Sequence, residues 1–180
     1  MNLKQFEFVT FQNDDKLIEK LNIDNIVIFG HSLGGYVALA FAEKYEHKLL
    51  GLGLILSTAL PDTEEKKQKR RQDIDAISVR GTQSYVRKLI PKLFAASNME
   101  KMKTEISTLI EVGLRMNAEG MRGILEGMQL RPNRSHVLAN ASYPILLVAG
   151  AEDQIVSPTE TFSVAPEELT YSTFHYPHIL

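Results

Sequence analysis

The chain has 180 residues, of which 44% are hydrophobic and 23% are charged, and its formal net charge is −2 at pH 7. This length and composition are typical of one globular domain, and the balanced charges argue against a nucleic-acid-binding surface. The sequence contains no cysteine, which excludes disulfides, a thiolate nucleophile and cysteine-bound metals. Neither a signal-peptide pattern nor an apolar run long enough to cross a membrane is present, so we expect a cytoplasmic protein without membrane contact.

The outer parts of the chain alternate between helical and strand patterns. Residues 14–22 predict a short helix, because their apolar side chains fall on one face. Residues 25–29 (NIVIF) form a continuous apolar run that is typical of a strand buried on both faces. A helical pattern follows at 34–47, and further buried strands are predicted at 49–56 and 143–149. Strand, helix and strand in this order predict a parallel sheet covered by helices.

The long stretch between the second and third predicted strands carries helical patterns only. Four helices are predicted here. The first begins with acidic residues at 62–65, and the second runs from 81 to 89 and is ended by Pro91. A capping box at 97–100 opens the third, which runs to 114, and the fourth spans 117–130 and is ended by Arg131 and Pro132. The basic run KKQKRR at 66–71 is interpreted as a solvated helix face. The methionines of this stretch are expected in contacts between helices, and some of them are candidates for lining a pliable apolar pocket.

The segment Gly30-His31-Ser32-Leu33-Gly34 lies directly between the first strand and its helix. A serine hydroxyl needs a base, exposure to substrate and donors for the oxyanion before it can act as a nucleophile. We interpret Ser32 as a nucleophile on a sharp turn, where Gly30 and Gly34 keep side chains out of the way. The backbone N–H of Leu33 would then serve as an oxyanion donor at the helix N-terminus. The alternative is a glycine-rich turn in which Ser32 only caps the helix.

With GHSLGG at 30–35 and PILLVAGAEDQIVSP at 144–158, the sequence resembles the α/β-hydrolase family from about residue 14 to residue 158. In that family the second segment is a late strand followed by G-x-x-D, whose aspartate orients the catalytic histidine. The resemblance therefore maps Asp153 onto the acid of a catalytic triad. The alternative for Asp153 is a turn residue that follows a strand.

The resemblance implies a partial α/β-hydrolase fold, with a parallel sheet, helices on both faces and a helical cap insertion. It divides a single domain over 1–180 into a core at about 14–60 and 142–180 and a cap at about 61–141. The segment that ends the cap, GMQLRPNRSHVLANASYP, resembles the corresponding segment of esterases and enol-lactonase-like members of the family. We expect the chain to correspond to the middle and late part of such a hydrolase, truncated at both ends.

The family order of Ser, Asp and His leaves His178 and His175 as candidates for the catalytic base. His178 is the better candidate, because it lies further beyond the strand that is expected to precede the histidine. His31 adjoins the nucleophile but should point elsewhere, His47 is expected at a helix end, and His136 is expected outside the site.

The function predicted from these residues is that of a serine hydrolase acting on a small apolar carboxylic ester or lactone through an acyl-enzyme. Ser32 and Asp153 are the catalytic candidates, Leu33 provides the oxyanion donor, and neither a cofactor nor a metal is expected. The alternatives are a non-catalytic fragment or interaction module of the same fold, and acyltransferase, peroxidase or lyase chemistry at the same turn. Self-association through the apolar edge at 25–29 is expected, because that strand is too apolar for an open edge.

Overall fold

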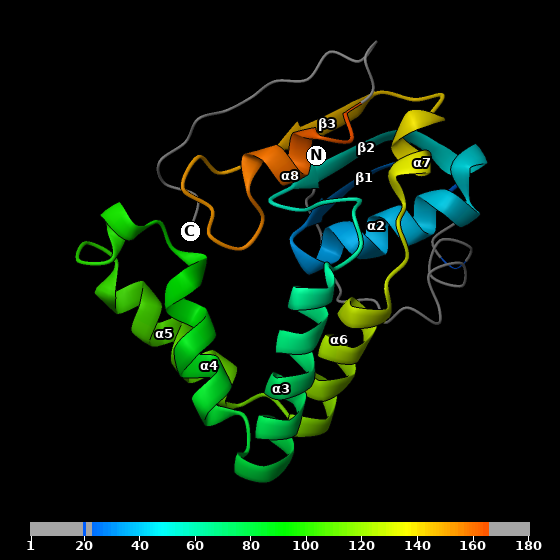
Figure 1. Ribbon diagram of the computed structural model, residues 1–180. Helices are drawn as coiled ribbons and strands as arrows, with labels where there is room; N and C mark the ends of the chain where they lie inside the picture. Colours follow the sequence, from blue (N-terminus) through cyan, green and yellow to red (C-terminus); the bar gives the residue numbers. More distant parts are fainter. Residues whose placement is uncertain (1–19, 21–22, 166–180) are drawn as a thin grey trace.

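The structure, a computed structural model, describes residue 20 and residues 23–165 (Figure 1). Its strands are β1 (Ile26–His31), β2 (Leu49–Ile55) and β3 (Ile145–Val148). The helices are α2 (Leu33–Lys44), α3 (Glu64–Arg80), α4 (Gln83–Leu89), α5 (Lys103–Leu114), α6 (Ala118–Leu130), α7 (Ser135–Ala139) and α8 (Pro158–Phe162), with short 3-10 helices η1 (Glu46–Lys48), η2 (Ile90–Leu93) and η3 (Ala96–Asn98). The helix predicted at 14–22 lies outside the described residues except for residue 20. No described helix combines the length and the apolarity needed to cross a membrane.

The three strands form one parallel sheet in the order β1-β2-β3, which confirms the predicted α/β class. Gly30 of β1 pairs with Leu54 of β2, and Leu52 of β2 pairs with Ile145 of β3. Helix α2 connects β1 to β2, and the helices from α3 to α7 connect β2 to β3. Because all three strands run in the same direction, their carboxyl ends meet at one edge of the sheet.

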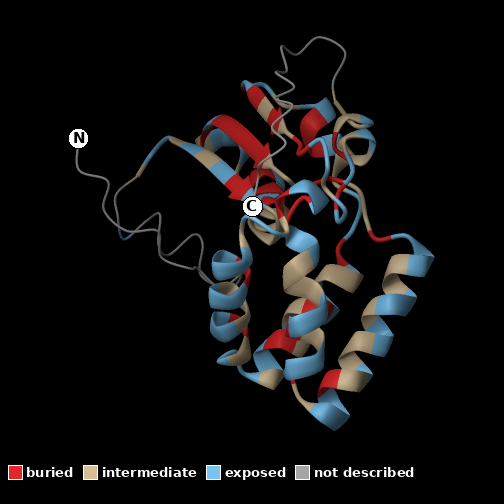
Figure 2. Ribbon diagram, turned by 90° about the vertical axis from the view of Figure 1, so that its left-hand side faces the viewer, coloured by how far each residue is buried: buried red, intermediate tan, exposed pale blue. Residues whose placement is uncertain are grey.

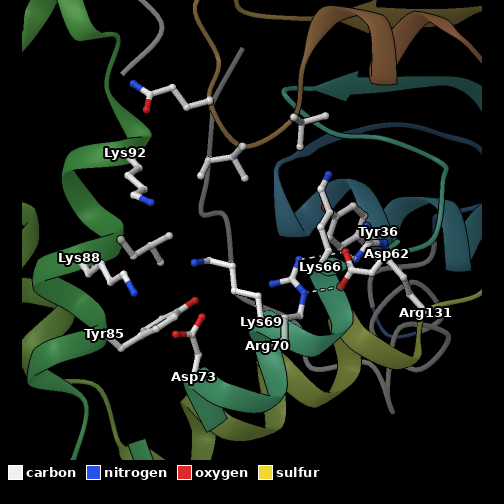
Figure 3. A pocket seen from close by; sticks show the side chains of 14 residues that line it. Tyr36, Asp62, Lys66, Lys69, Arg70, Asp73, Tyr85, Lys88, Lys92 and Arg131 are labelled. Atoms are coloured by element: carbon white, nitrogen blue, oxygen red, sulfur yellow. Dashed lines mark hydrogen bonds and ion pairs between the residues drawn. The ribbon is translucent and has the colours of Figure 1, made fainter. Parts of the chain in front are cut away.

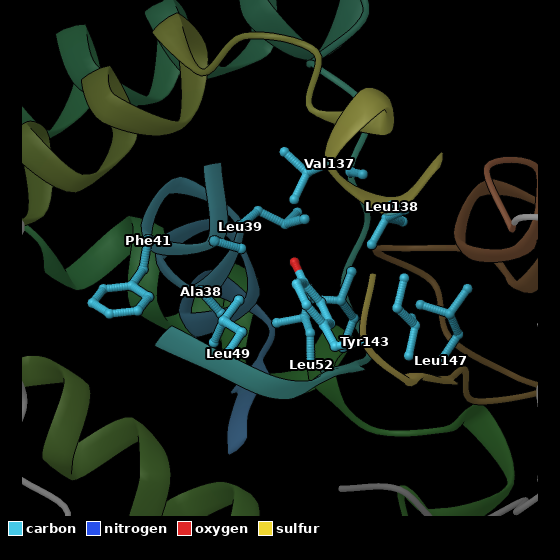
Figure 4. Close-up of a cluster of buried hydrophobic side chains, with 13 residues drawn as sticks. Ala38, Leu39, Phe41, Leu49, Leu52, Val137, Leu138, Tyr143 and Leu147 are labelled. Atoms are coloured by element: carbon cyan, nitrogen blue, oxygen red, sulfur yellow. The ribbon is translucent and has the colours of Figure 1, made fainter. Parts of the chain in front are cut away.

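One apolar cluster fixes α2 and α7 against the sheet (Figure 4). Leu39 of α2, Leu52 of β2, Leu138 of α7 and Leu147 of β3 are almost completely buried in it. Burying a leucine side chain of this kind contributes about 1.5–3 kcal/mol. The position of α2 on the sheet is therefore determined by several such contacts, and with it the position of the turn that precedes α2.

The prediction that the first strand is buried on both faces is wrong for the described part of the chain. Ile26 and Ile28 pack toward the apolar cluster, whereas Val27 and Phe29 are 54% and 57% exposed. Side chains alternate between the two faces of a strand, so an exposed face leaves every second residue uncovered. Leu50, next to the register irregularity of β1 and β2, is also exposed.

Helices α3 to α6 form a helical insertion that lies to one side of the sheet (Figure 1). It has a small apolar cluster of its own, built by Ile77, Val86, Met121 and Leu125, and its outward surfaces are largely exposed (Figure 2). The methionine contact between helices that the sequence predicted is thus confirmed for Met121.

The helix starts at Thr63 and Asn117 are capped by side chains, of which the first was predicted, and another predicted cap is absent. The Thr63 hydroxyl accepts from the Lys66 amide at 3.2 Å, and the Asn117 side chain accepts from the Glu119 amide at 2.7 Å. The capping box predicted at 97–100 is wrong, because this segment forms η3 and a turn, and α5 begins only at Lys103. The backbone bonds of that turn are local ones, such as the Asn98 amide to the Ala95 carbonyl at 2.9 Å.

Candidate active site

Ser32 occupies a strained turn between the end of β1 and the start of α2. Its φ of 51° and ψ of −118° lie in a region that non-glycine residues rarely adopt. Its amide donates to the Ile55 carbonyl at 2.9 Å, and its carbonyl accepts from the Gly35 amide at 2.9 Å. The Ser32 side chain forms no capping bond to α2, which argues against the alternative in which it only caps the helix.

The glycines of the turn serve different purposes. A Cβ at Gly30 would lie 2.5 Å from the Gly34 carbonyl oxygen, and a Cβ at Gly35 would overlap the Ser57 hydroxyl. A Cβ at Gly34 would meet no described atom within 4 Å. The tight packing of the turn against its own backbone and against Ser57 therefore requires Gly30 and Gly35. The expectation that Gly34 is the second required glycine is wrong.

The backbone at the start of α2 offers a donor beside Ser32. Leu33 is the first residue of the helix, where amide groups have no acceptor within the helix. Its N–H donates to no acceptor among the described residues. An unpaired N–H at a helix N-terminus is suited to stabilise an oxyanion.

Asp153 lies in the loop that follows β3, and this loop holds one of its carboxylate oxygens. Oδ1 accepts from the Ile155 amide at 2.8 Å and from the Val156 amide at 3.0 Å. Ser32 follows β1 and Asp153 follows β3, so both stand at the carboxyl edge of the sheet with β2 between them. The remaining oxygen of Asp153 accepts no bond from the described residues.

The described histidines do not provide a base for Ser32. Neither His31, which is exposed at the end of β1, nor His47 forms a hydrogen bond with it. His136 interacts with Glu43, at 3.0 Å between Nε2 and Oε1. The candidates His175 and His178 lie outside the described residues.

Ser57 lies beside the candidate site and was not predicted from the sequence. It is completely buried behind the turn, and its hydroxyl donates to the Ser32 carbonyl at 2.9 Å. The preceding residue, Leu56, has a φ of 51°, a second strained backbone position beside the first. The available signal was a serine directly after a buried strand, at the same edge as Ser32.

A cavity of about 220 Å³ lies between the helical insertion and the core (Figure 3). It is lined from three directions, by Tyr36 of α2, by residues of α3 and α4, and by the loop after Asp153. Its lining residues are Tyr36, Asp62, Lys66, Lys69, Arg70, Asp73, Tyr85, Lys88, Leu89, Lys92, Arg131, Gln154, Ile155 and Val156. Six of these side chains are cationic and two are carboxylates.

Asp62 and Arg131 connect the two ends of the helical insertion, because they lie just before α3 and just after α6. Arg131 Nη1 lies 2.8 Å from Asp62 Oδ1, and its guanidinium stacks on the Tyr36 ring at 4.2 Å. Arg70 of α3 donates to the same carboxylate through Nε and Nη2. Burial alone would raise the pKa of Asp62, but the bonds and charges of Arg70 and Arg131 lower it below the usual value.

One prediction about the insertion needs correction. The basic run at 66–71 is only partly a solvated face, because Lys66, Lys69 and Arg70 line the cavity. Their spacing of i, i+3 and i+4 places them on one side of α3. No methionine is among the lining residues of this cavity, and a pocket lined by methionines stays a prediction. The described residues also hold no group of three or more His, Cys, Asp or Glu side chains suited to a metal ion.

Comparison with solved structures identifies several similar esterases and lactonases. A thermophilic esterase from Thermogutta terrifontis, described with malate bound, is 31% identical with a TM-score of 0.79, and the match covers 88% of this chain and 59% of that chain. The enol-lactonase from Burkholderia xenovorans LB400 is 18% identical with a TM-score of 0.79, over 91% of this chain and 62% of that chain. An esterase from Exiguobacterium antarcticum is 14% identical with a TM-score of 0.75, over 91% and 63%.

The chain thus spans about three fifths of the length of these proteins. No curated protein sequence matches it. A family profile described as serine aminopeptidase, S33, matches residues 7–172, which is most of the chain and includes the Ser32 turn and the Asp153 loop. The chain therefore belongs to the α/β-hydrolase family that this profile describes.

Proposed function

We propose that the chain is a serine hydrolase that cleaves carboxylic esters or lactones through an acyl-enzyme, with Ser32 as the nucleophile. The strained turn carries this proposal, because it leaves the Ser32 side chain free of the helix and places it at the edge of the sheet that Asp153 also reaches. The esterase and lactonase descriptions of the similar structures support the same reaction class.

In the proposed reaction the Ser32 hydroxyl attacks the ester carbonyl and gives its proton to an imidazole, for which His178 is the first candidate and His175 the second. The Leu33 N–H stabilises the resulting oxyanion. The leaving alkoxide takes the proton from the imidazolium as the acyl-enzyme forms. Water then attacks the acyl-enzyme, and the acid is released with the serine restored. Asp153 would hold the imidazole in orientation with its unoccupied oxygen.

The helical insertion is proposed to act as a cap that encloses the substrate. This corresponds to the cap that the sequence predicts at about 61–141 within a single domain. If neither His178 nor His175 serves as the base, turnover should be weak. Loss of a triad member typically leaves only about 10³–10⁴-fold catalysis over water. The cytoplasmic location stays a prediction.

A fluorophosphonate probe followed by mass spectrometry tests the nucleophile directly. We expect an adduct on Ser32 and none in Ser32→Ala. A folded protein that stays unlabelled would contradict the proposal and favour the alternative of a non-catalytic module. Hydrolysis of 4-nitrophenyl butyrate by the variants His178→Ala and His175→Ala identifies the base, because only one of them should abolish the Ser32-dependent rate.

A further inference from the structure

We propose that the ester or lactone cleaved at Ser32 carries a carboxylate, and that Lys69, Lys88 and Lys92 bind this group in the cavity under the helical insertion. The inference rests on the proposed function and replaces the expectation of a purely apolar substrate. It starts from the charges of the cavity, where six cationic side chains face only two carboxylates in the lining.

The cations of the cavity differ in their partners. Arg70 and Arg131 share the buried carboxylate of Asp62, and Lys66 Nζ lies 2.7 Å from Oε2 of Glu160, next to the cavity. Lys69, Lys88 and Lys92 form no ion pair with any described carboxylate. The excess of positive charge is therefore concentrated on these three lysines.

The three lysines approach the same space from two sides. Lys69 projects from α3, whereas Lys88 and Lys92 project from α4 and η2, and their side chains point toward one another across the cavity (Figure 3). Like charges that face one another repel, and an anion placed between them relieves this repulsion. A carboxylate can accept a charge-assisted hydrogen bond from each ammonium group that it reaches.

The other titratable groups around the three lysines do not neutralise their positive charge. Asp73 is the single lining carboxylate outside the Asp62 cluster. Burial and the charge of Asp73 raise the pKa of Tyr85 to about 12, so its phenol is neutral at pH 7 and can donate a hydrogen bond. An anionic group would thus meet three ammonium groups and a phenol donor against one carboxylate.

The cavity also has an apolar part that suits a short carbon chain. Leu89 on one side and Ile155 and Val156 on the other line it. The latter two belong to the loop held by Asp153, and Tyr36 of the lining lies one helical turn after Ser32. A substrate with its scissile carbonyl at Ser32 would extend a short chain past these residues and its carboxylate toward the lysines.

Two matched pairs of esters test whether a carboxylate on the substrate increases the rate, with the carboxylate in the acyl part in the first pair and in the leaving group in the second. The first pair is mono-4-nitrophenyl glutarate and 4-nitrophenyl pentanoate, and the second is 4-acetoxybenzoate and 4-acetoxybenzamide. We expect kcat/KM for the charged member of at least one pair to exceed that of its neutral partner by about tenfold or more. The preference should fall about tenfold in Lys88→Met and in Lys69→Met. Lys101→Met, an exposed lysine outside the cavity, is the control and should retain it.

Binding to Ser32→Ala separates this inference from the proposed function. Glutarate should bind this variant in a calorimetric titration, and the triple replacement of Lys69, Lys88 and Lys92 by methionine should abolish binding. Lysine-dependent binding without any turnover would support the cavity and reject the proposed function. Three results would each overturn the inference. The first is Ser32-dependent hydrolysis with equal rates for the charged and neutral ester of both pairs, and the second is no binding of glutarate. The third is sulfate binding as tight as glutarate binding, which would reveal an adventitious ion only.

Discussion

Replacing Asp62 by asparagine should destabilise the protein strongly, because this carboxylate joins the start and the end of the helical insertion. Its side chain is 0% exposed and accepts from both Arg70 and Arg131. Removing one partner of a buried ion pair costs about 3–5 kcal/mol. Arg70 is 20% exposed and can turn toward water, and Arg131 keeps its bonds to the carbonyls of Leu60 and Met128. We therefore expect a loss of about 2–4 kcal/mol in the free energy of unfolding.

Urea denaturation of the wild type and of Asp62→Asn at pH 7 measures this loss. Asp75→Asn is the matched control, since Asp75 is exposed on α3 and should change stability by less than about 0.5 kcal/mol. The lowered pKa of Asp62 stabilises the fold above the ordinary carboxyl pKa, and this contribution is lost as the pH falls through the lowered value. The difference between wild type and Asp62→Asn should therefore shrink in acid. Equal stabilities at pH 7, or a difference that does not depend on pH, would refute the reasoning.

Three further predictions concern the turn, the cavity and the sheet. Gly35→Ala should lower the free energy of unfolding by about 1–3 kcal/mol and abolish fluorophosphonate labelling, because the new Cβ would overlap a buried hydroxyl, whereas Gly34→Ala should be tolerated. Tyr85 has a pKa raised to about 12, so folding favours its neutral form and the free energy of unfolding should fall as the pH rises from about 10 to 12. Denaturation curves of Tyr85→Phe should show a flatter decline, and a decline equal to that of the wild type would contradict this prediction. Phe29→Lys should reduce self-association in analytical ultracentrifugation, because Phe29 is an exposed aromatic on the edge strand of the described sheet, and a wild type that is wholly monomeric would reject this expectation.

The strands and the turn could be predicted because their signals are local. Continuous apolar runs predict strands, and Ser32 between a strand and a helix predicts the turn, so the parallel sheet followed from residues that are neighbours in sequence. The roles of Gly34 and Gly35 could not be separated in this way. They depend on Ser57, which is distant in sequence and reaches the turn only in the folded chain.

The cavity was missed for a related reason. A run of basic residues is most often a solvated face, and only the helical spacing of Lys66, Lys69 and Arg70 hints that they share one side. The residues that complete the ion pairs of Lys66 and Asp62 lie on other elements and cannot be assigned from local patterns. Glu160 is 94 residues away from Lys66, and Arg131 reaches Asp62 only because α6 returns beside α3.

The cations of helix α3 fall into two groups with different consequences for the protein. Arg70 is neutralised by Asp62, so its charge is committed to holding the insertion on the core. Lys69 is its neighbour in sequence but has no carboxylate partner among the described residues, so its charge is available to a ligand. A surface lysine without a partner contributes little to stability, whereas a paired and half-buried arginine contributes more. Stability and anion binding should therefore respond to different substitutions on one helix, with Arg70→Met lowering the free energy of unfolding and Lys69→Met lowering the affinity for glutarate.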